Sequence, residues 1–187
     1  IQNFGKIYAT LLGASPTSYI DISLGQLKSI NVNFVGEVNF PGLYSVHPFS
    51  SVILGLMQAG GVDTTGSLRD IKIKREADDN IYSFDMYEYL LNGKSSDFLQ
   101  LRDGDIVIVP IRKSTIQIDS LVHRPGIYES TEGESIWDLI NYAGGVKSYA
   151  SSQIGLHRIK PFEDRKNSEP IFSNYYLDYN KSKSVAA

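Results

Sequence analysis

Apolar and polar residues alternate in the stretch INVNFVG (30–36), a pattern typical of a β-strand with one buried face. Ile30, Val32 and Phe34 form the apolar side of this strand. The Pro41-Gly42 pair that follows predicts a turn, because proline restricts φ and glycine accepts positive φ. The stretch LYSV (43–46) then supplies a returning strand, so the pattern predicts a β-hairpin.

A helical pattern follows the hairpin. Ser50 or Ser51 can cap a helix in which apolar residues recur at a spacing of three or four, and Gly60 can end it in the left-handed conformation. We expect this helix to pack on the sheet through one apolar stripe. The stripe consists of Val52, Ile53, Leu56 and Met57, of which the first three should be buried.

Four further short elements complete this unit. The stretches IKIKR (71–75) and IYSFD (81–85) have the composition of strands, and MYEYLLN (86–92) that of a helix ended by Gly93. GDIVIVP (104–110) has the composition of a buried strand. The order ββαββαβ with short connections predicts a small sheet curled around one main helix, which is a β-grasp fold of the α+β class.

The chain then repeats itself at an offset of 84 residues. EVNFPGLYSV (37–46) is matched by LVHRPGIYES (121–130), and QAGGV (58–62) by YAGGV (142–146). Blocks that match in the same order at nearly constant spacing predict a structural duplication. The motif residues are Gly36, Pro41, Gly42, Tyr44, Gly60, Gly61 and Asp105 in the first copy, and Pro125, Gly126, Tyr128, Gly144 and Gly145 in the second.

We therefore expect two tandem β-grasp domains, at residues 30–112 and 114–187, after a lead-in at residues 1–29. In the second domain the helix should bury the counterparts of the first stripe, which are Ile136, Trp137 and Ile140.

The second domain is predicted to be incomplete at its C-terminus. IGLHR (154–158) corresponds to IKIKR, and Asp178 corresponds to Asp85. By this alignment the closing strand GDIVIVP would have its counterpart beyond Ala187. Either the chain was cut there, or the missing strand comes from elsewhere.

Composition excludes several functions. A formal net charge of -3 and a pI near 5.6 argue against nucleic-acid binding, which usually needs a basic face. Cysteine is absent, and the longest apolar runs are too short to span a membrane. The three histidines are scattered, and no nucleophile or phosphate-binding motif occurs, so we expect no metal, no cofactor and no catalytic residue. The chain opens without a signal segment, so we expect it to be part of a longer mature protein whose targeting segment lay upstream.

Three features could bind a ligand. Lys72 and Lys74 share one strand face and could meet an acidic glycan, but the pattern favours a solvated outer face or an edge strand that lysines protect from aggregation. Tyr175 and Tyr176 could stack on sugars, although the strand-like pattern around them also suits tyrosines of a core or an interface. Glu37 is an acidic residue within the hairpin motif that the second copy lacks.

Taken together, these motifs resemble a known family. VGEVNFPGLY followed by QAGGV, RDIKIKR and LRDGDIVIVP is similar to the SLBB domain, the soluble ligand-binding β-grasp. Tandem copies resemble the periplasmic part of outer-membrane polysaccharide export proteins. YIDISLGQLKSINV is similar to the segment that joins an upstream export domain to the first SLBB copy. The resemblance covers about residues 19–160.

The resemblance implies a non-catalytic role in the export of capsular polysaccharide or exopolysaccharide. Its members form rings of identical subunits at the outer membrane and contact an inner-membrane polysaccharide co-polymerase, so we expect a periplasmic location. A glycan-binding or small-ligand-binding module outside the export pore is the alternative. An enzyme acting on polysaccharide is the third hypothesis, but a glycosidase needs two carboxylates in one cleft, and no such pair is indicated by the motifs.

Overall fold

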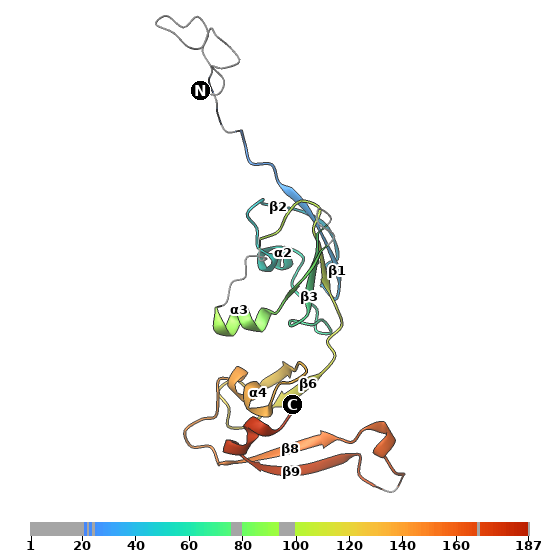
Figure 1. Cartoon of the computed structure of the whole chain (residues 1–187), viewed down its shortest axis with the longest axis vertical. Helices are drawn as coiled ribbons and strands as arrows, with labels where there is room; N and C mark the ends of the chain where they lie inside the picture. The colour runs from blue at the N-terminus through green and yellow to red at the C-terminus, as the bar shows by residue number, and fades with distance from the viewer. Residues whose placement is uncertain are drawn as a thin grey trace, which may run out of the picture.

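The computed structural model describes residues 21, 23, 25–75, 80–93, 100–167 and 169–186. Two similar units follow one another along the chain and lie end to end (Figure 1). We call residues 30–112 copy one and residues 114–187 copy two. The fold is α+β, with two tandem β-grasp units, and the described strands of the second unit form two separate hairpins.

Copy one is built on a five-stranded sheet with the order β2-β1-β5-β3-β4. β1 (Ile30–Gly36) and β2 (Gly42–Val46) form the predicted hairpin. β5 (Ile106–Val109) lies between β1, to which it is parallel, and β3 (Ile71–Lys74), to which it is antiparallel. β4 (Ile81–Phe84) is an edge strand. The last strand of the unit therefore occupies the centre of the sheet.

Helix α2 (Val52–Gln58) packs on this sheet, and Ser51 caps it by accepting a hydrogen bond from the Leu54 N–H at 3.3 Å. Val52 and Leu56 are buried as predicted, whereas Ile53 is only half-buried. The assignment of Met57 to the packed apolar stripe is wrong, because its side chain is 69% exposed. Each residue turns about 100° around a helix axis, so a face centred on residues 52, 55 and 56 directs Met57 to solvent.

Gly55 is the third buried residue of α2, and the packing of Phe34 requires a glycine there. A Cβ at Gly55 would lie 2.5 Å from Phe34 Cζ, which is far inside van der Waals contact. Copy two has Ile118 in place of Phe34 and Leu139 in place of Gly55. A smaller strand residue is thus matched with a larger helix residue in copy two.

Helix α3 (Met86–Asn92) follows β4 and ends at Gly93, which has φ 63°. Asp85 caps this helix by accepting a hydrogen bond from the Tyr87 N–H at 2.8 Å. Figure 1 shows α3 at the end of copy one that faces copy two. The residues around its first turn are therefore available for contact with the second unit.

Copy two consists of two separate hairpins and a helix. β6 (Thr115–Ile118) pairs with β7 (Gly126–Glu129), and β8 (Gln153–Ile159) pairs with β9 (Phe172–Asp178). The registers repeat those of copy one, since Ile116 faces Tyr128 as Val32 faces Tyr44, and Ile154 faces Leu177 as Ile71 faces Phe84. Two short 3-10 helices, η3 (Phe162–Asp164) and η4 (Tyr179–Ser184), precede and follow β9.

Helix α4 (Ile136–Tyr142) buries Ile136, Leu139 and Ile140. The prediction that Trp137 is buried is wrong, because its side chain is half-buried and Lys183 Nζ lies 4.5 Å from its ring centroid. The rotation of the helix about its axis explains the partial exposure of Trp137 and of its counterpart in copy one, Ile53. The buried face of both helices uses the first, fourth and fifth residues, which share one side at 3.6 residues per turn.

Candidate functional site at the joint between the copies

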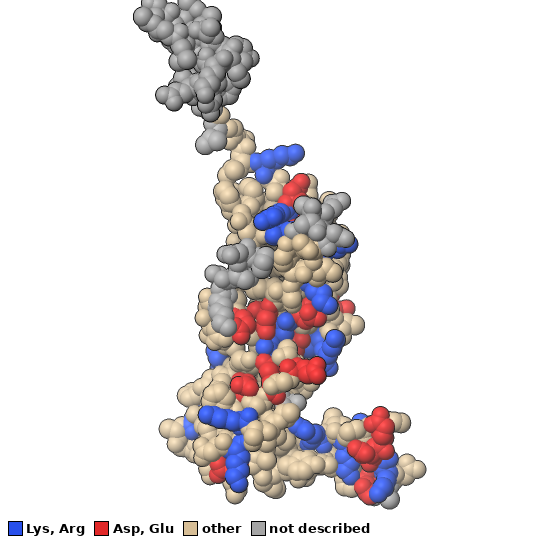
Figure 2. All heavy atoms as spheres, in the orientation of Figure 1, with Lys and Arg blue, Asp and Glu red and all other residues tan. Residues whose placement is uncertain are grey.

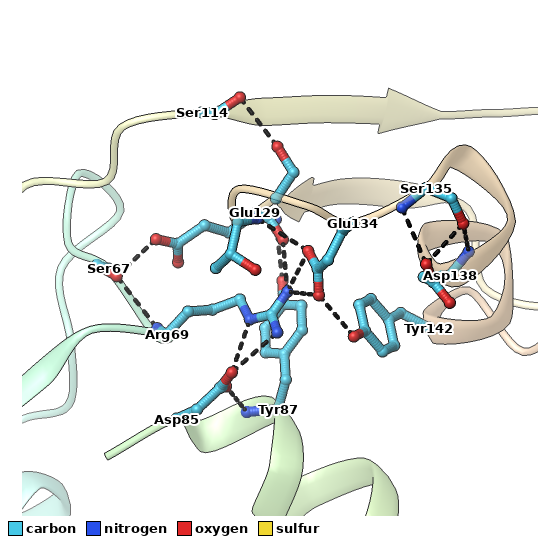
Figure 3. A network of polar contacts seen from close by, with 12 residues as sticks. Ser67, Arg69, Asp85, Tyr87, Ser114, Glu129, Glu134, Ser135, Asp138 and Tyr142 are labelled. Carbon is cyan, nitrogen blue, oxygen red and sulfur yellow. Dashed lines mark hydrogen bonds and ion pairs between the residues drawn. The ribbon is translucent and has the colours of Figure 1, made fainter. Parts of the chain in front are cut away.

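Arg69 is the centre of a polar network that joins the two copies (Figure 3). It precedes β3 and is 8% exposed. Its Nε and Nη2 donate hydrogen bonds to Asp85 Oδ2 of copy one, at 3.0 and 2.8 Å. Its Nη1 donates to both carboxylate oxygens of Glu134 in copy two, at 2.6 and 2.7 Å. One guanidinium therefore holds one carboxylate from each copy.

Two tyrosines enclose the Arg69 guanidinium. Its central carbon lies 4.7 Å from the ring centroid of Tyr87, on α3, and 5.1 Å from that of Tyr142, on α4. The two rings contact each other edge to face, with centroids 5.5 Å apart. A cation over aromatic faces is attracted by their negative charge density, and the effect grows when water is excluded. The tyrosines thus add attraction and keep water away from the ion pairs.

Glu129, at the end of β7, makes a second connection between the copies. Its carboxylate accepts hydrogen bonds from the Ser67 hydroxyl at 2.5 Å and from the Leu68 N–H at 2.8 Å. The Glu129 N–H donates to the Tyr87 hydroxyl oxygen at 3.1 Å. The residue is 6% exposed, so these bonds form away from bulk water. A buried acid is stable only when such donors satisfy it.

The protonation of the joint is set by these contacts. Burial alone lowers the pKa of Arg69, but hydrogen bonds to Asp85 and Glu134 and their charges outweigh burial and raise it. Burial alone raises the pKa of Glu134, but hydrogen bonds from Arg69, the Thr131 N–H and the Tyr142 hydroxyl lower it. Burial and the bond to Glu134 raise the pKa of Tyr142 to about 12. Arg69 and Glu134 are therefore both charged at neutral pH.

The contacts of the joint are those of a structural interface between the copies. Its acids are engaged by Arg69, by hydroxyl groups or by backbone N–H groups. A glycosidase instead presents two carboxylates to an open cleft, one of them as an acid that can release its proton. Figure 2 shows acidic and basic side chains interleaved at the middle of the described surface, where the two copies meet. The arrangement fixes one copy against the other.

Sequence analysis did not find this joint. Its main residues fall where the repeat breaks: Glu129 aligns with Ser45, Glu134 with Ser50 and Tyr142 with Gln58. A charged or aromatic residue that occurs in only one copy of an otherwise matched block can indicate a contact between the copies, because the two copies meet through different surfaces. That signal would have pointed to Glu129, Glu134 and Tyr142, but not to which residue they contact.

The candidate binding residues fall on different elements. Lys72 forms an ion pair with Asp70 at 3.4 Å, and both side chains are 42% exposed. Lys72 and Lys74 lie on β3, which is inside the sheet, so the prediction of a lysine-protected edge strand is wrong. The cause is β5, which inserts beside β3 and leaves β4 at the edge.

The other candidates lie at separate places. The Glu37 carboxylate follows β1 and accepts a hydrogen bond from the hydroxyl of Thr65, which lies between α2 and β3. Tyr175 and Tyr176 lie on β9 and are 51% and 79% exposed. Neither tyrosine is a core residue. Tyr179, which follows β9 as the first residue of η4, packs against the apolar cluster of copy two. No common site for these residues is indicated in the part of the chain that the structure describes.

The motif residues have structural roles that repeat between the copies. The Tyr44 hydroxyl donates to the Phe40 carbonyl at 2.8 Å, and the Tyr128 hydroxyl donates to the Arg124 carbonyl at 2.6 Å. Each tyrosine thus closes the turn that holds Pro41-Gly42 or Pro125-Gly126. Asp105, 1% exposed, accepts from Arg75 Nε at 3.2 Å and from the Arg102 N–H at 2.9 Å. Among the motif glycines, positive φ occurs at Gly36, Gly42, Gly60, Gly61, Gly144 and Gly145.

Two further searches were made over the described residues. They contain no group of three or more His, Cys, Asp or Glu side chains placed to hold a metal ion. Within the same residues, no helix is long and apolar enough to cross a membrane.

Comparison with known proteins identifies the family. The model of the SLBB domain matches residues 32–85 and 120–171, which together are more than half of the chain. The chain belongs to the SLBB domain family. It is also similar to two curated proteins of Escherichia coli, both called polysialic acid transport protein KpsD, with 34% identity over 176 residues. The matched region is 92% of this chain, but it spans only 28% of the length of these relatives.

Proposed function

We propose that this chain is a non-catalytic part of a polysaccharide export protein, and that it acts through contacts with other subunits. The similarity to polysialic acid transport proteins supports the class of cargo, a capsular polysaccharide or exopolysaccharide. The observation that carries the mechanical role is the Arg69 joint, which holds two SLBB copies in one orientation. A stiff pair of domains suits a ring, because each subunit must present its contact surfaces at a fixed angle.

In this proposal the chain lies in the periplasm as part of a protein associated with the outer membrane. Its partners are further copies of itself, an inner-membrane polysaccharide co-polymerase and the polysaccharide in transit. We propose the domain division at residues 30–112 and 114–187, with residues 1–29 leading in from an upstream export domain. A cyclic ring needs two different patches on each subunit that meet head to tail.

Complementation tests the function. Deleting the gene of the parent protein should remove polysaccharide from the cell surface and retain it inside the cell. The wild-type gene and a Lys72→Met variant should restore export, since the Lys72 ion pair is exposed. An Arg69→Met variant should restore less, because its joint is broken. Unchanged surface polysaccharide after deletion contradicts the export function.

Sedimentation tests the role of the SLBB copies in assembly. Stable interfaces usually bury about 1,200–2,000 Å², and single contacts of small domains are expected to bury less. The isolated chain should therefore be monomeric or weakly associated at micromolar concentration, and the parent protein should form the ring. A closed ring of the isolated chain would show that the two copies suffice for assembly. A parent protein that stays monomeric contradicts the ring.

One observation favours the alternative, a glycan-binding module. Tyr175 lines a hollow of about 260 Å³ beside β8 and β9, together with Arg158, Lys160 and Asp164. An aromatic face beside basic side chains can bind an acidic sugar. Calorimetric titration with an acidic oligosaccharide separates the two functions. The glycan-binding function is supported if the chain binds the oligosaccharide and if Tyr175→Ala, but not the control Tyr89→Ala, abolishes that binding. If no binding occurs, the role in contacts between subunits remains the proposed function.

A further inference from the structure

The outer side of α2 is apolar in copy one and polar in copy two. Phe40, Leu54 and Met57 are 53% to 69% exposed, and we call these three residues the α2 patch. Leu54 and Met57 lie one turn apart on α2, and the Phe40 N–H donates to the Ala59 carbonyl at the end of this helix, at 2.9 Å. At the offset of 84 residues their counterparts are, in the same order, Arg124, Asp138 and Asn141.

The fold of copy two uses two of these polar counterparts. Arg124 Nη2 donates to the carbonyl of Tyr142, the last residue of α4, at 2.9 Å. Asp138 Oδ2 accepts from the Ser135 N–H at 2.9 Å and completes a capping box. Both contacts stabilise the ends of a helix. Copy one has apolar side chains in solvent at these positions, and exposed apolar patches of this kind mark sites of interaction.

A second apolar surface lies at the far end of copy two, on an extended hairpin. β8 and β9 have seven residues each, whereas their counterparts β3 and β4 have four each. The connection is also longer, because it consists of residues 160–171 instead of residues 75–80. Large apolar side chains near the end of this hairpin are 47% to 81% exposed, and we call them the hairpin tip: Ile159, Phe162, Ile171 and Phe172.

The hairpin tip is held in place by contacts of its own. The Lys160 N–H donates to the Ile171 carbonyl at 2.8 Å, and Lys160 Nζ lies 3.1 Å from Glu169 Oε2. Arg165 Nε donates to the Lys160 carbonyl at 3.0 Å, and its guanidinium carbon lies 5.8 Å from the Phe162 ring centroid. These contacts place an arginine beside the most exposed side chain of the tip. A surface that is already fixed loses less conformational entropy when it binds.

Arg165 complements the end of α2 in charge and in hydrogen bonding. In copy two the carbonyl at the end of α4 accepts a hydrogen bond from Arg124. The matching carbonyl in copy one belongs to Gln58, the last residue of α2, but Phe40 stands in the place of Arg124 and cannot donate. The carbonyl end of a helix carries partial negative charge. An arginine beside an aromatic ring, as Arg165 lies beside Phe162, therefore suits this end of α2.

The two surfaces are held apart within one molecule. Figure 1 shows α2 in copy one and the hairpin of β8 and β9 at the far end of copy two, where it projects sideways. The Arg69 joint holds the copies in this orientation. One chain thus carries two different apolar surfaces, which a head-to-tail contact between identical subunits requires. The exposed acids Glu163 and Asp164 follow Phe162, so the tip is poorly suited to an anionic membrane surface.

We propose that the hairpin tip of one subunit docks on the α2 patch of a neighbouring subunit. Phe162 packs against Phe40 and Met57 of the neighbouring subunit, and Arg165 donates to its Gln58 carbonyl. The inference rests on the proposed role of this chain in contacts between subunits.

The size of the two surfaces sets the strength of the contact. So few side chains bury on the order of 400 Å² per subunit, since a large aromatic side chain buries about 150–250 Å². A stable interface buries roughly 800 Å² per partner. The contact is therefore weak between isolated chains, and it gains strength when other parts of the parent protein already hold the subunits side by side.

Cysteine cross-linking tests the contact, because the chain contains no cysteine. Gln58→Cys and Glu163→Cys lie beside the two surfaces, are exposed positions and leave the apolar side chains intact. Chains with one change each and with different affinity tags are mixed at high concentration and oxidised. The mixed pair should form a disulfide-linked dimer. The matched control pairs Glu163→Cys with Asn141→Cys, an exposed position at the counterpart of Met57, and should form far less.

A triple variant separates the contact from the fold. Phe40→Arg, Leu54→Asp and Met57→Asn give α2 the residues that copy two carries at the same positions. Because those residues suit α4, the variant should unfold at no lower temperature than the wild type, while its cross-linking through Gln58→Cys should fall to the control level.

Phe162→Ala supplies an independent variant, because Phe162 is 81% exposed and the fold does not depend on it. Sedimentation over a range of concentrations should show self-association weakened by about tenfold or more, as the loss of a central aromatic anchor does. Arg165→Met should weaken it less, and Arg165→Lys should restore part of that loss.

The outcomes decide between the possible contacts. A cross-linked mixed pair that is lost in the folded triple variant, together with the effect of Phe162→Ala, supports the proposal. Equal cross-linking of the mixed and control pairs overturns it, and so does a preference for Gln58→Cys homodimers, which would assign the α2 patch to a symmetric dimer. A parent protein that exports polysaccharide but gives no cross-link overturns this contact alone. Surface polysaccharide that survives deletion of the parent gene contradicts the export function instead.

Discussion

Replacing Arg69 with methionine removes the charge that holds the two copies together and keeps an unbranched apolar stem between the tyrosines. In the wild-type joint the Arg69 side chain is 5% exposed, and its partners Asp85 and Glu134 are 24% and 14% exposed. After the change both carboxylates lose their guanidinium while remaining largely shielded from water. The expected effect is therefore that of breaking a buried ion pair.

Breaking such a pair costs about 3–5 kcal/mol, because the remaining charge is left without compensation. We expect about 3 kcal/mol, the lower end, since Asp85 keeps some access to water. The matched control is Lys72→Met, which also removes a cation from an ion pair. Both side chains of that pair are 42% exposed, so we expect a loss of less than about 1 kcal/mol.

Urea denaturation followed by two signals measures the effect. Trp137 fluorescence reports copy two, and far-ultraviolet circular dichroism reports both copies. In the wild-type chain the joint should couple the copies, so the two signals should change together. In Arg69→Met the free energy of unfolding should fall and the two signals should separate. A fall of less than about 1 kcal/mol in the free energy of unfolding, with both signals changing together, would refute the argument that Arg69 stabilises the joint as a buried ion pair.

Three further predictions concern packing, pH and the repeated tyrosines. Gly55→Ala should lower the free energy of unfolding by about 1–3 kcal/mol in chemical denaturation, because its Cβ would meet Phe34. Adding Phe34→Ile should relieve part of that loss. Losses that simply add in the double variant contradict the packing argument. Because the pKa of Glu134 is lowered from 4.5, its stabilising contribution is complete above that pH and is lost as pH falls through the lower folded-state pKa. The free energy of unfolding, measured by denaturation between pH 6 and 3, should show this loss, and Glu134→Gln should make its dependence on pH less steep. An equally steep pH dependence in the variant argues against this role of Glu134. Tyr44→Phe and Tyr128→Phe should each lower the free energy of unfolding by about 0.5–1.5 kcal/mol, because each change removes one hydrogen bond to a carbonyl. A large loss of stability for only one of the two variants would contradict the equivalent roles of the two tyrosines.

Local sequence patterns determined most of the elements. The alternation of Val32 and Phe34 and the turn at Pro41-Gly42 predicted the first hairpin, and the structure confirms it. The repeat carried that prediction to the second hairpin, where Ile116 and Tyr128 share the same register. These features follow from residues near one another in the sequence, because turn chemistry and side-chain period are local properties.

Predictions about faces were less reliable. Met57 was placed on the apolar stripe of its helix, and Trp137 was expected to be buried as the counterpart of Ile53. The structure exposes the first and half-exposes the second. A short helix with apolar residues on several sides does not specify its own rotation. The partner surface sets it, here through the fit of Phe34 against Gly55 and of Leu139 in the core of copy two.

The sequence by itself determined the duplicated β-grasp, because the two copies share matching blocks of residues in the same order. Only the tertiary structure decided that Arg69 meets Glu134, 65 residues away, and that β5 lies inside the sheet beside β3. It also showed an apolar cavity between β6, β8 and α4. The physical reason is that such contacts depend on how distant segments are brought together in space, which no local pattern of residues records.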